Sequence, residues 1–157
     1  MKPFSLKNFF TNNSAKKVKE RRHNPRPADG SDFTILIVDD SRTAVALFTR
    51  TLSQAGFKTI SATDGLEGVS AAKEHLPDLI LMDVVMPRLN GFQATRKIRK
   101  NDTTAHIPII IVSGEQQATE QFWGKRVGAN AFLTKPVDRG ELFKGIFEML
   151  DKKTEDQ

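Results

Sequence analysis

Short apolar runs alternate with longer segments of mixed polarity along most of this chain. Each run is bounded by proline, glycine or polar residues, which is typical of fully buried strands rather than of helices. We therefore predict five strands, at residues 33–38, 57–62, 79–83, 107–112 and 131–134.

The segments after these runs place apolar residues on one helical face, as Val45, Phe48 and Leu52 do in the first of them. Polar residues that can cap a helix precede four of the five segments. The capping residues are Ser41, Asp64, Asn90 and Asp138, and the predicted helices are 42–55, 65–76, 91–100, 115–127 and 139–150.

Strand and helix thus alternate five times, which predicts an α/β fold whose parallel strands are covered by helices on both faces. Right-handed crossovers then give a doubly wound five-stranded sheet. The pattern assigns residues 33–150 to one domain, residues 1–32 to a basic N-terminal extension and residues 151–157 to a C-terminal tail.

Composition restricts the function further. The chain has no cysteine, so disulfides and thiolate metal sites are excluded. It has no apolar run of about 18 residues and no apolar signal region near its start, so we expect a cytoplasmic protein. Eight of the 24 basic and three of the 19 acidic residues lie in residues 1–32, which accounts for the net charge of +5. Because the predicted domain is neutral, a nucleic-acid function for the whole protein is not favoured.

The N-terminal extension allows two interpretations. Residues 24–31 have the proline, glycine and small polar residues of a linker. Aromatic residues near the start and a basic run at residues 16–22 fit either a solvated tail or a short amphipathic anchor for a membrane or partner. Both interpretations stay open, as does the possibility that this basic segment binds nucleic acid.

Polar groups end four of the five predicted strands. Asp39 and Asp40 follow the first strand, Asp83 ends the third, Ser113 follows the fourth and Lys135 the fifth. Parallel strands present their carboxyl ends at one edge of the sheet, where ligands bind in such folds. Each group alone has an ordinary explanation, such as a helix cap or a solvated side chain. Their joint order at successive strand ends predicts one site.

The residue types in this site indicate phosphoryl chemistry. Three carboxylates this close repel one another unless a cation lies among them, and oxygen ligands without histidine or cysteine favour Mg²⁺. A carboxylate beside Mg²⁺ can attack phosphorus and form an aspartyl phosphate. Lys135 would add positive charge, and Ser113 would donate a hydroxyl hydrogen bond to a phosphoryl oxygen.

Four motifs carry a family resemblance. They are Val38–Ser41, Met82–Gly91, Val112–Ser113 and Thr134–Pro136. They resemble the receiver domains of two-component response regulators, the CheY-like family, over about residues 33–150. The resemblance implies a flavodoxin-like (βα)5 fold with strand order 2-1-3-4-5. Within the family, residues 90–96 and 123–126 are similar to PilH-type regulators of type IV pilus (twitching motility) chemosensory systems.

The resemblance also implies roles for the site residues. Asp83 would accept the phosphoryl group, and Mg²⁺ would be bound by Asp39, Asp40, Asp83 and the backbone carbonyl of Val85. Ser113 would move toward the phosphoryl group.

Two residues near the fifth strand complete the implied site. Lys135 would pair with Asp83 or its phosphate, next to a cis Lys135–Pro136 bond. Phe132 occupies the aromatic switch position. Because Phe132 has no hydroxyl, it can change its burial but cannot form a hydrogen bond in either state.

The implied protein is a single-domain response regulator whose chemistry is limited to its own phosphorylation and autodephosphorylation. A histidine kinase (CheA-like) or a phosphotransfer domain would supply the phosphoryl group. Output would be protein–protein interaction through the face formed by the predicted elements at 115–127, 131–134 and 139–150. We expect no DNA-binding domain, since few residues follow Leu150.

One alternative function is a Mg²⁺-dependent phosphohydrolase of the haloacid-dehalogenase type. Those enzymes also use an aspartate nucleophile on a doubly wound sheet. They have an Asp-x-Asp motif at the end of the first strand, whereas this chain has the adjacent pair Asp39 and Asp40.

Overall fold

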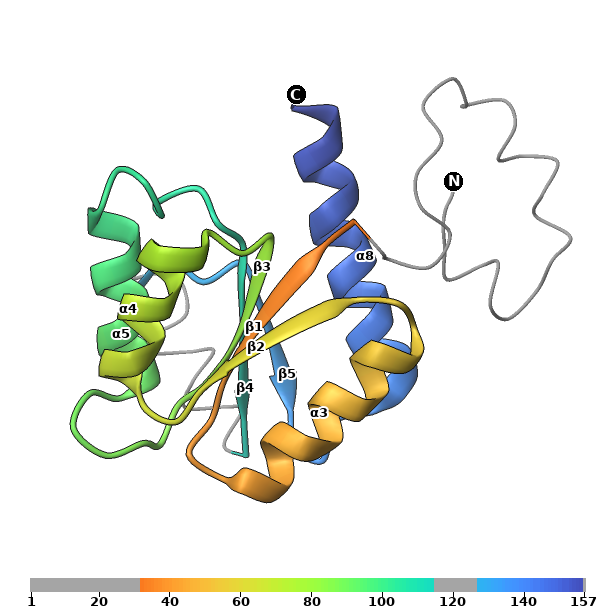
Figure 1. Ribbon diagram of the computed structural model, residues 1–157, viewed down its shortest axis with the longest axis horizontal. Coiled ribbons are helices and arrows are strands. Elements are labelled where there is room, and N and C mark those ends of the chain that lie inside the picture. The colour runs from red at the N-terminus through yellow and green to blue at the C-terminus, as the bar shows by residue number, and fades with distance from the viewer. Residues whose placement is uncertain (1–31, 115–126, 157) are drawn as a thin grey trace, which may run out of the picture.

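The structure, a computed structural model, describes residues 32–114 and 127–156. Its five strands form one parallel sheet in the order β2-β1-β3-β4-β5, which confirms the predicted doubly wound fold (Figure 1). The predicted N-terminal extension and most of the helix predicted at 115–127 lie outside the described residues. The strands are β1 (Thr34–Val38), β2 (Lys58–Ala62), β3 (Leu79–Asp83), β4 (Ile109–Ser113) and β5 (Ala131–Thr134).

The helices cover the sheet on both sides. Helices α3 (Arg42–Gln54) and α8 (Arg139–Glu155) lie on one side, and α4 (Gly65–His75) and α5 (Gly91–Lys100) lie together on the other (Figure 1). None of the helices in the described ranges is both long enough and apolar enough to cross a membrane.

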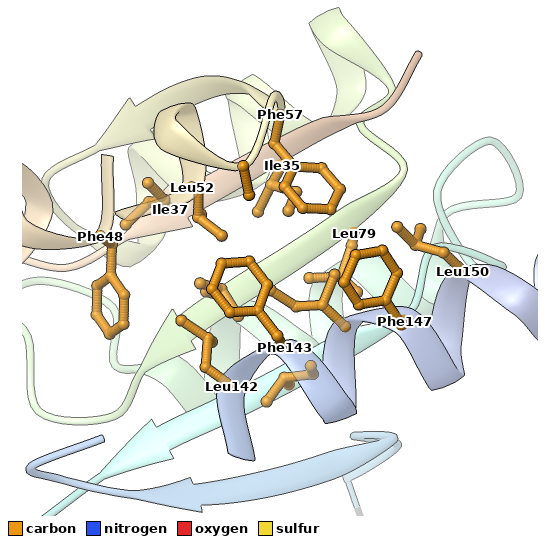
Figure 2. Packing of buried hydrophobic residues seen from close by; sticks show 14 of the residues in the cluster. Ile35, Ile37, Phe48, Leu52, Phe57, Leu79, Leu142, Phe143, Phe147 and Leu150 are labelled. Atoms are coloured by element: carbon orange, nitrogen blue, oxygen red, sulfur yellow. The ribbon is translucent and has the colours of Figure 1, made fainter. Parts of the chain in front are cut away.

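The layer under α3 and α8 combines aliphatic side chains with a group of phenylalanines. Phe57, Phe143 and Phe147 contact one another with ring centroids 5.8 to 6.4 Å apart (Figure 2). Aromatic pairs at this separation add to the free energy of burial. Strand residues Ile35 and Leu79 are fully buried beneath these rings.

The buried hydrophobic side chains under α4 and α5 are aliphatic or methionine in the described residues. Gly68 of α4 faces Val38, where an added Cβ would lie 2.9 Å from a valine methyl group. Ala72 and Ala94 are fully buried, so both helices pack closely on the sheet. Leu66, at the start of α4, is 44% exposed and takes no part in this core.

Several element ends differ from the predictions. Strand β4 begins at Ile109 rather than at Ile107, because Pro108 has no N–H to donate to the sheet. Helix α8 continues past Leu150 to Glu155, so most of the segment predicted as a tail is helical. The four predicted capping residues each accept a hydrogen bond from the first helical turn. Glu67, three residues after the capping residue Asp64, accepts a hydrogen bond from the N–H of Thr63 rather than from that of Asp64.

Candidate functional site

Three carboxylates meet at the carboxyl edge of the sheet. Asp39 and Asp40 follow β1, Asp83 ends β3, and these two strands pair directly. One carboxylate oxygen from each residue lies within 4.8 Å of the others. Asp39 and Asp83 are buried and Asp40 is exposed. The acidic cluster predicted from the sequence is therefore present, with two members inside the protein and one at its rim.

Lys135 lies between the two buried carboxylates. Its Nζ is 3.0 Å from Asp39 Oδ2 and 3.1 Å from Asp83 Oδ1. Burial lowers the pKa of Lys135, but hydrogen bonds and charges from Asp39 and Asp83 outweigh burial and raise the pKa overall. Lys135 therefore carries a positive charge here. The peptide bond from Lys135 to Pro136 is cis, as the family resemblance implied.

One lysine does not compensate for the whole acidic cluster. Burial raises the pKa of Asp83, and the charge of Asp39 raises it further, while Lys135 acts in the opposite direction. A raised carboxyl pKa means that the ionised form is less stable in this place than in water. The site is therefore suited to a further cation, which would favour the ionised carboxylate.

The predicted residues of the fourth and fifth strands reach the same edge. Ser113 ends β4, is buried, and pairs in register with Thr134 of β5. The backbone N–H of Lys135 donates to the carbonyl of Ser113 at 2.9 Å. Phe132 of β5 is half-buried and packs against the core under α4 and α5. The structure thus brings Ser113 and Lys135 to the edge that holds the acidic cluster.

The chain after β3 packs closely against the acidic residue that ends it. The N–H of Gly91 donates to the carbonyl of Val84 at 2.9 Å. A Cβ at Gly91 would lie 2.0 Å from the carbonyl oxygen of Asp83, so only glycine fits. Val85 is 77% exposed, with its apolar side chain in solvent beside the cluster.

Two contacts near the site were not predicted from the sequence. Lys135 binds Asp39 as well as Asp83. Arg88, which follows the Met-Pro motif, binds Asp64, which was predicted only as a helix cap. No local spacing signals this second contact, because the two residues are 24 positions apart.

The donor set fits a divalent cation of the Mg²⁺ type. It consists of carboxylate oxygens, and Mg²⁺ is typically held by one or two carboxylates with the remaining positions filled by water. The exposed member, Asp40, leaves one side of the cluster open to solvent. Asp39 is more constrained, because its Oδ1 already accepts from the N–H of Ser41 at 2.9 Å.

Comparisons with known proteins agree with this geometry. Residues 35–147 match the family described as the response regulator receiver domain. The chain is 49% identical to Protein PilH of Pseudomonas aeruginosa over 116 residues, which is 74% of this chain and 96% of that protein.

Solved structures show the same likeness. The chemotaxis protein CheY4 of Vibrio cholerae has a TM-score of 0.71 and 31% identity, covering 75% of this chain and 98% of that one. A receiver domain of a sensor histidine kinase from Pseudomonas aeruginosa has a TM-score of 0.72 and 28% identity, covering 76% and 98%. That structure is described as having a magnesium ion coordinated in its active-site cleft.

Proposed function

The chain belongs to the response regulator receiver family, and from this premise we propose that Asp83 accepts a phosphoryl group from a histidine kinase. The observation that carries the proposal is the meeting of Asp83 with Asp39, Asp40 and Lys135 at one edge of the sheet. Receivers are signalling proteins rather than classical enzymes, so the family favours this function over the phosphohydrolase alternative. The phosphoryl donor would be a CheA-like kinase or a phosphotransfer domain.

Asp39, Asp40, Asp83 and the backbone carbonyl of Val85 would hold Mg²⁺. When bound, the ion would neutralise charge on the carboxylates and on the oxygens of the incoming phosphoryl group. The raised pKa of Asp83 supports this assignment, because the ionised nucleophile needs more positive charge than Lys135 alone supplies.

The transfer itself needs little more than positioning. Lys135 binds Oδ1 of Asp83 and holds the carboxylate in place, and one oxygen of this carboxylate would attack phosphorus. A bond forms between that oxygen and phosphorus, and the bond from phosphorus to the donor breaks with its electron pair leaving on the donor. Lys135 and the Ser113 hydroxyl would then donate hydrogen bonds to phosphoryl oxygens.

The added charge would change the neighbouring surface. A phosphoryl group adds about −1.5 to −2 charge at neutral pH and new acceptor oxygens. Movement of Ser113 toward these oxygens would leave space for Phe132 to become more buried. The output surface would include β5 and α8 together with residues 115–126, which lie outside the described part of the chain. Because Phe132 has no hydroxyl, packing alone would carry its part of the change.

The similarity to PilH supports a cellular role in type IV pilus (twitching motility) or chemotaxis-like control. We propose that output is the binding of a downstream protein that distinguishes the two phosphorylation states. In a strain from which the gene for this protein has been deleted, the wild-type protein should restore surface motility and Asp83→Asn should not. If both proteins restored motility, the role in motility would not depend on phosphorylation of Asp83.

Labelling with acetyl phosphate tests the phosphoryl chemistry directly. Wild-type protein with Mg²⁺ should gain the mass of one phosphoryl group, and Asp83→Asn or chelation of Mg²⁺ should abolish this gain. Asp78→Asn is the matched control, because Asp78 is also bound to a lysine but lies just before β3, at the opposite edge. Labelling of Asp83→Asn at the wild-type level would remove Asp83 from the role of acceptor.

A further inference from the structure

The loop between β3 and α5, residues 84–90, is tied to helix α4 by an ion pair. Arg88 donates from Nε to Asp64 Oδ2 at 3.0 Å and also from Nη2 to the same oxygen. The other oxygen of Asp64 accepts from the N–H of Glu67 at 2.9 Å and caps α4. The Glu67 N–H and the Arg88 side chain lower the pKa of Asp64. Asp64 therefore serves both the helix and the loop with separate oxygens.

Arg88 has an uncommon backbone conformation. Arg88 has φ of 68°, in the left-handed region that side chains other than glycine and asparagine rarely adopt. Such conformations persist when surrounding contacts hold them. The next residue, Leu89, contacts α4 directly, since a Cβ at Gly65 would lie 2.1 Å from its carbonyl oxygen. The second half of the loop is thus fixed on the first turn of α4.

The first half of the loop is fixed on the sheet side. The carbonyl of Val84 accepts from Gly91, and the side chain of Met86 is buried in the core under α4 and α5. Val85 lies between these two anchored residues, with its side chain exposed. The position of its carbonyl therefore depends on how firmly both halves of the loop are held.

We propose that Arg88 is a positioning residue. Its ion pair with Asp64 holds the loop in the conformation in which the Val85 carbonyl and the Asp83 carboxylate present oxygens to one divalent cation. This inference rests on the proposed function, since it assumes that the acidic cluster binds Mg²⁺.

The sign of one substitution separates positioning from simple charge effects. Arg88→Ala removes a positive charge near an acidic site, so the electric field alone would make Mg²⁺ bind more tightly. A loosened loop would make Mg²⁺ bind more weakly. Loss of an outer-shell contact typically weakens metal binding by about tenfold or more. We expect the dissociation constant of Mg²⁺ for Arg88→Ala to rise by about tenfold.

Titration calorimetry with Mg²⁺ on the full chain provides the measurement. Arg88→Lys, which keeps a cation able to reach Asp64, should recover part of the affinity. Arg50→Ala is the matched control, because it removes one exposed arginine from α3 and should leave the affinity unchanged. Asp64→Asn removes the negative charge that pairs with Arg88, so it should weaken Mg²⁺ binding. Because it keeps an amide oxygen for the cap, it should not unfold α4.

The double variant Arg88→Ala with Asp64→Asn completes the test. If both residues act through one contact, the Mg²⁺ affinity of the double variant should equal that of whichever single variant binds Mg²⁺ less tightly. Affinity of Arg88→Ala equal to or higher than that of wild type would overturn the proposal while the proposed function stands. Failure of the wild type itself to bind Mg²⁺ would overturn both. A thermal unfolding midpoint measured in EDTA would separate loss of fold from loss of positioning.

Discussion

At the carboxyl edge of the sheet, one lysine contacts two of the three aspartates, whereas at the amino edge each carboxylate oxygen of Asp78 has its own donor. Asp78 there accepts from the N–H of Thr34 and from Lys153 Nζ, both at 2.8 Å. At the carboxyl edge, burial and a neighbouring carboxylate raise the pKa of Asp83. The carboxyl edge, where chemistry is proposed, thus has more negative than positive charge, whereas Asp78 at the amino edge is paired with Lys153.

Arg99 is a half-buried cation at the amino edge whose hydrogen-bond partners, within the part of the chain that the structure describes, are neutral oxygens rather than carboxylates. Its guanidinium donates to the backbone carbonyls of Ala105, Ile107 and Gly128 at 2.7 to 3.1 Å and to Asn130 Oδ1 at 2.7 Å. Burial lowers the pKa of Arg99. Neutral carbonyl and amide oxygens can thus stabilise a half-buried guanidinium charge in the place where a carboxylate could stand.

The largest effect on stability should come from removing this cation. Arg99→Met leaves several carbonyls without their donor, so the free energy of unfolding should fall by about 3 kcal/mol in urea denaturation. Arg96→Met, on an exposed part of the same helix, is the control and should change it little. Acetyl phosphate labelling should survive in both variants. If the free energy of unfolding fell by a similar amount in both variants, the positive charge on the helix, rather than the hydrogen bonds of Arg99, would be what stabilises this edge.

Removing an acid at the carboxyl edge should have the opposite sign. Asp83→Asn in EDTA should raise the free energy of unfolding at pH 7 by about 1 kcal/mol, the usual size of a point substitution. The pKa of Asp83 is raised in the folded protein above its ordinary value of 3.8. As the pH rises from 3.8 through the raised pKa, the unfolded chain loses its proton more readily than the folded one, so the wild type loses stability. The variant lacks this loss. The gap between the two proteins should therefore widen from pH 4 to pH 7, and a constant gap would contradict the assigned cause.

The smallest expected effect concerns the ion pair at the amino edge. Lys153→Met removes the partner of Asp78, whose other oxygen still accepts from Thr34. Since both side chains are partly exposed, the free energy of unfolding should fall by only about 0.5 kcal/mol. The difference should shrink in 1 M salt, which screens exposed charges. A loss as large as that of Arg99→Met would mean that the two edges differ less than their contacts indicate.

The strands and the polar residues at their ends could be predicted because both follow from local patterns. Apolar runs locate the buried strands, and a parallel sheet brings their carboxyl ends to one edge. The strand order that makes β1 and β3 neighbours, and so places Asp39 beside Asp83, came from the family resemblance rather than from a local pattern. Contacts made by long side chains have no such rule. The pairing of Arg88 with Asp64 depends on a left-handed residue in the loop, and neither its sequence neighbours nor its spacing indicates that conformation.

Burial on helices was predictable only in part. The apolar spacing on α5 predicts that both Phe92 and Ile98 face the core; Ile98 is buried, but Phe92 is only partly buried. The helix period identifies an inner face, whereas the exposure of residues at its margin depends on the neighbouring segment. The start of β4 was missed for a different reason, since the apolar pattern around Pro108 continues although the hydrogen-bond ladder does not.

The contact between Gly91 and the carbonyl of Asp83 has a mechanical consequence. The first residue of α5 touches the backbone of the proposed acceptor with no side chain between them. A shift of the Asp83 backbone in that direction would therefore press on the start of α5. Any protein that grips α5 would in turn restrict the movement allowed to the acceptor.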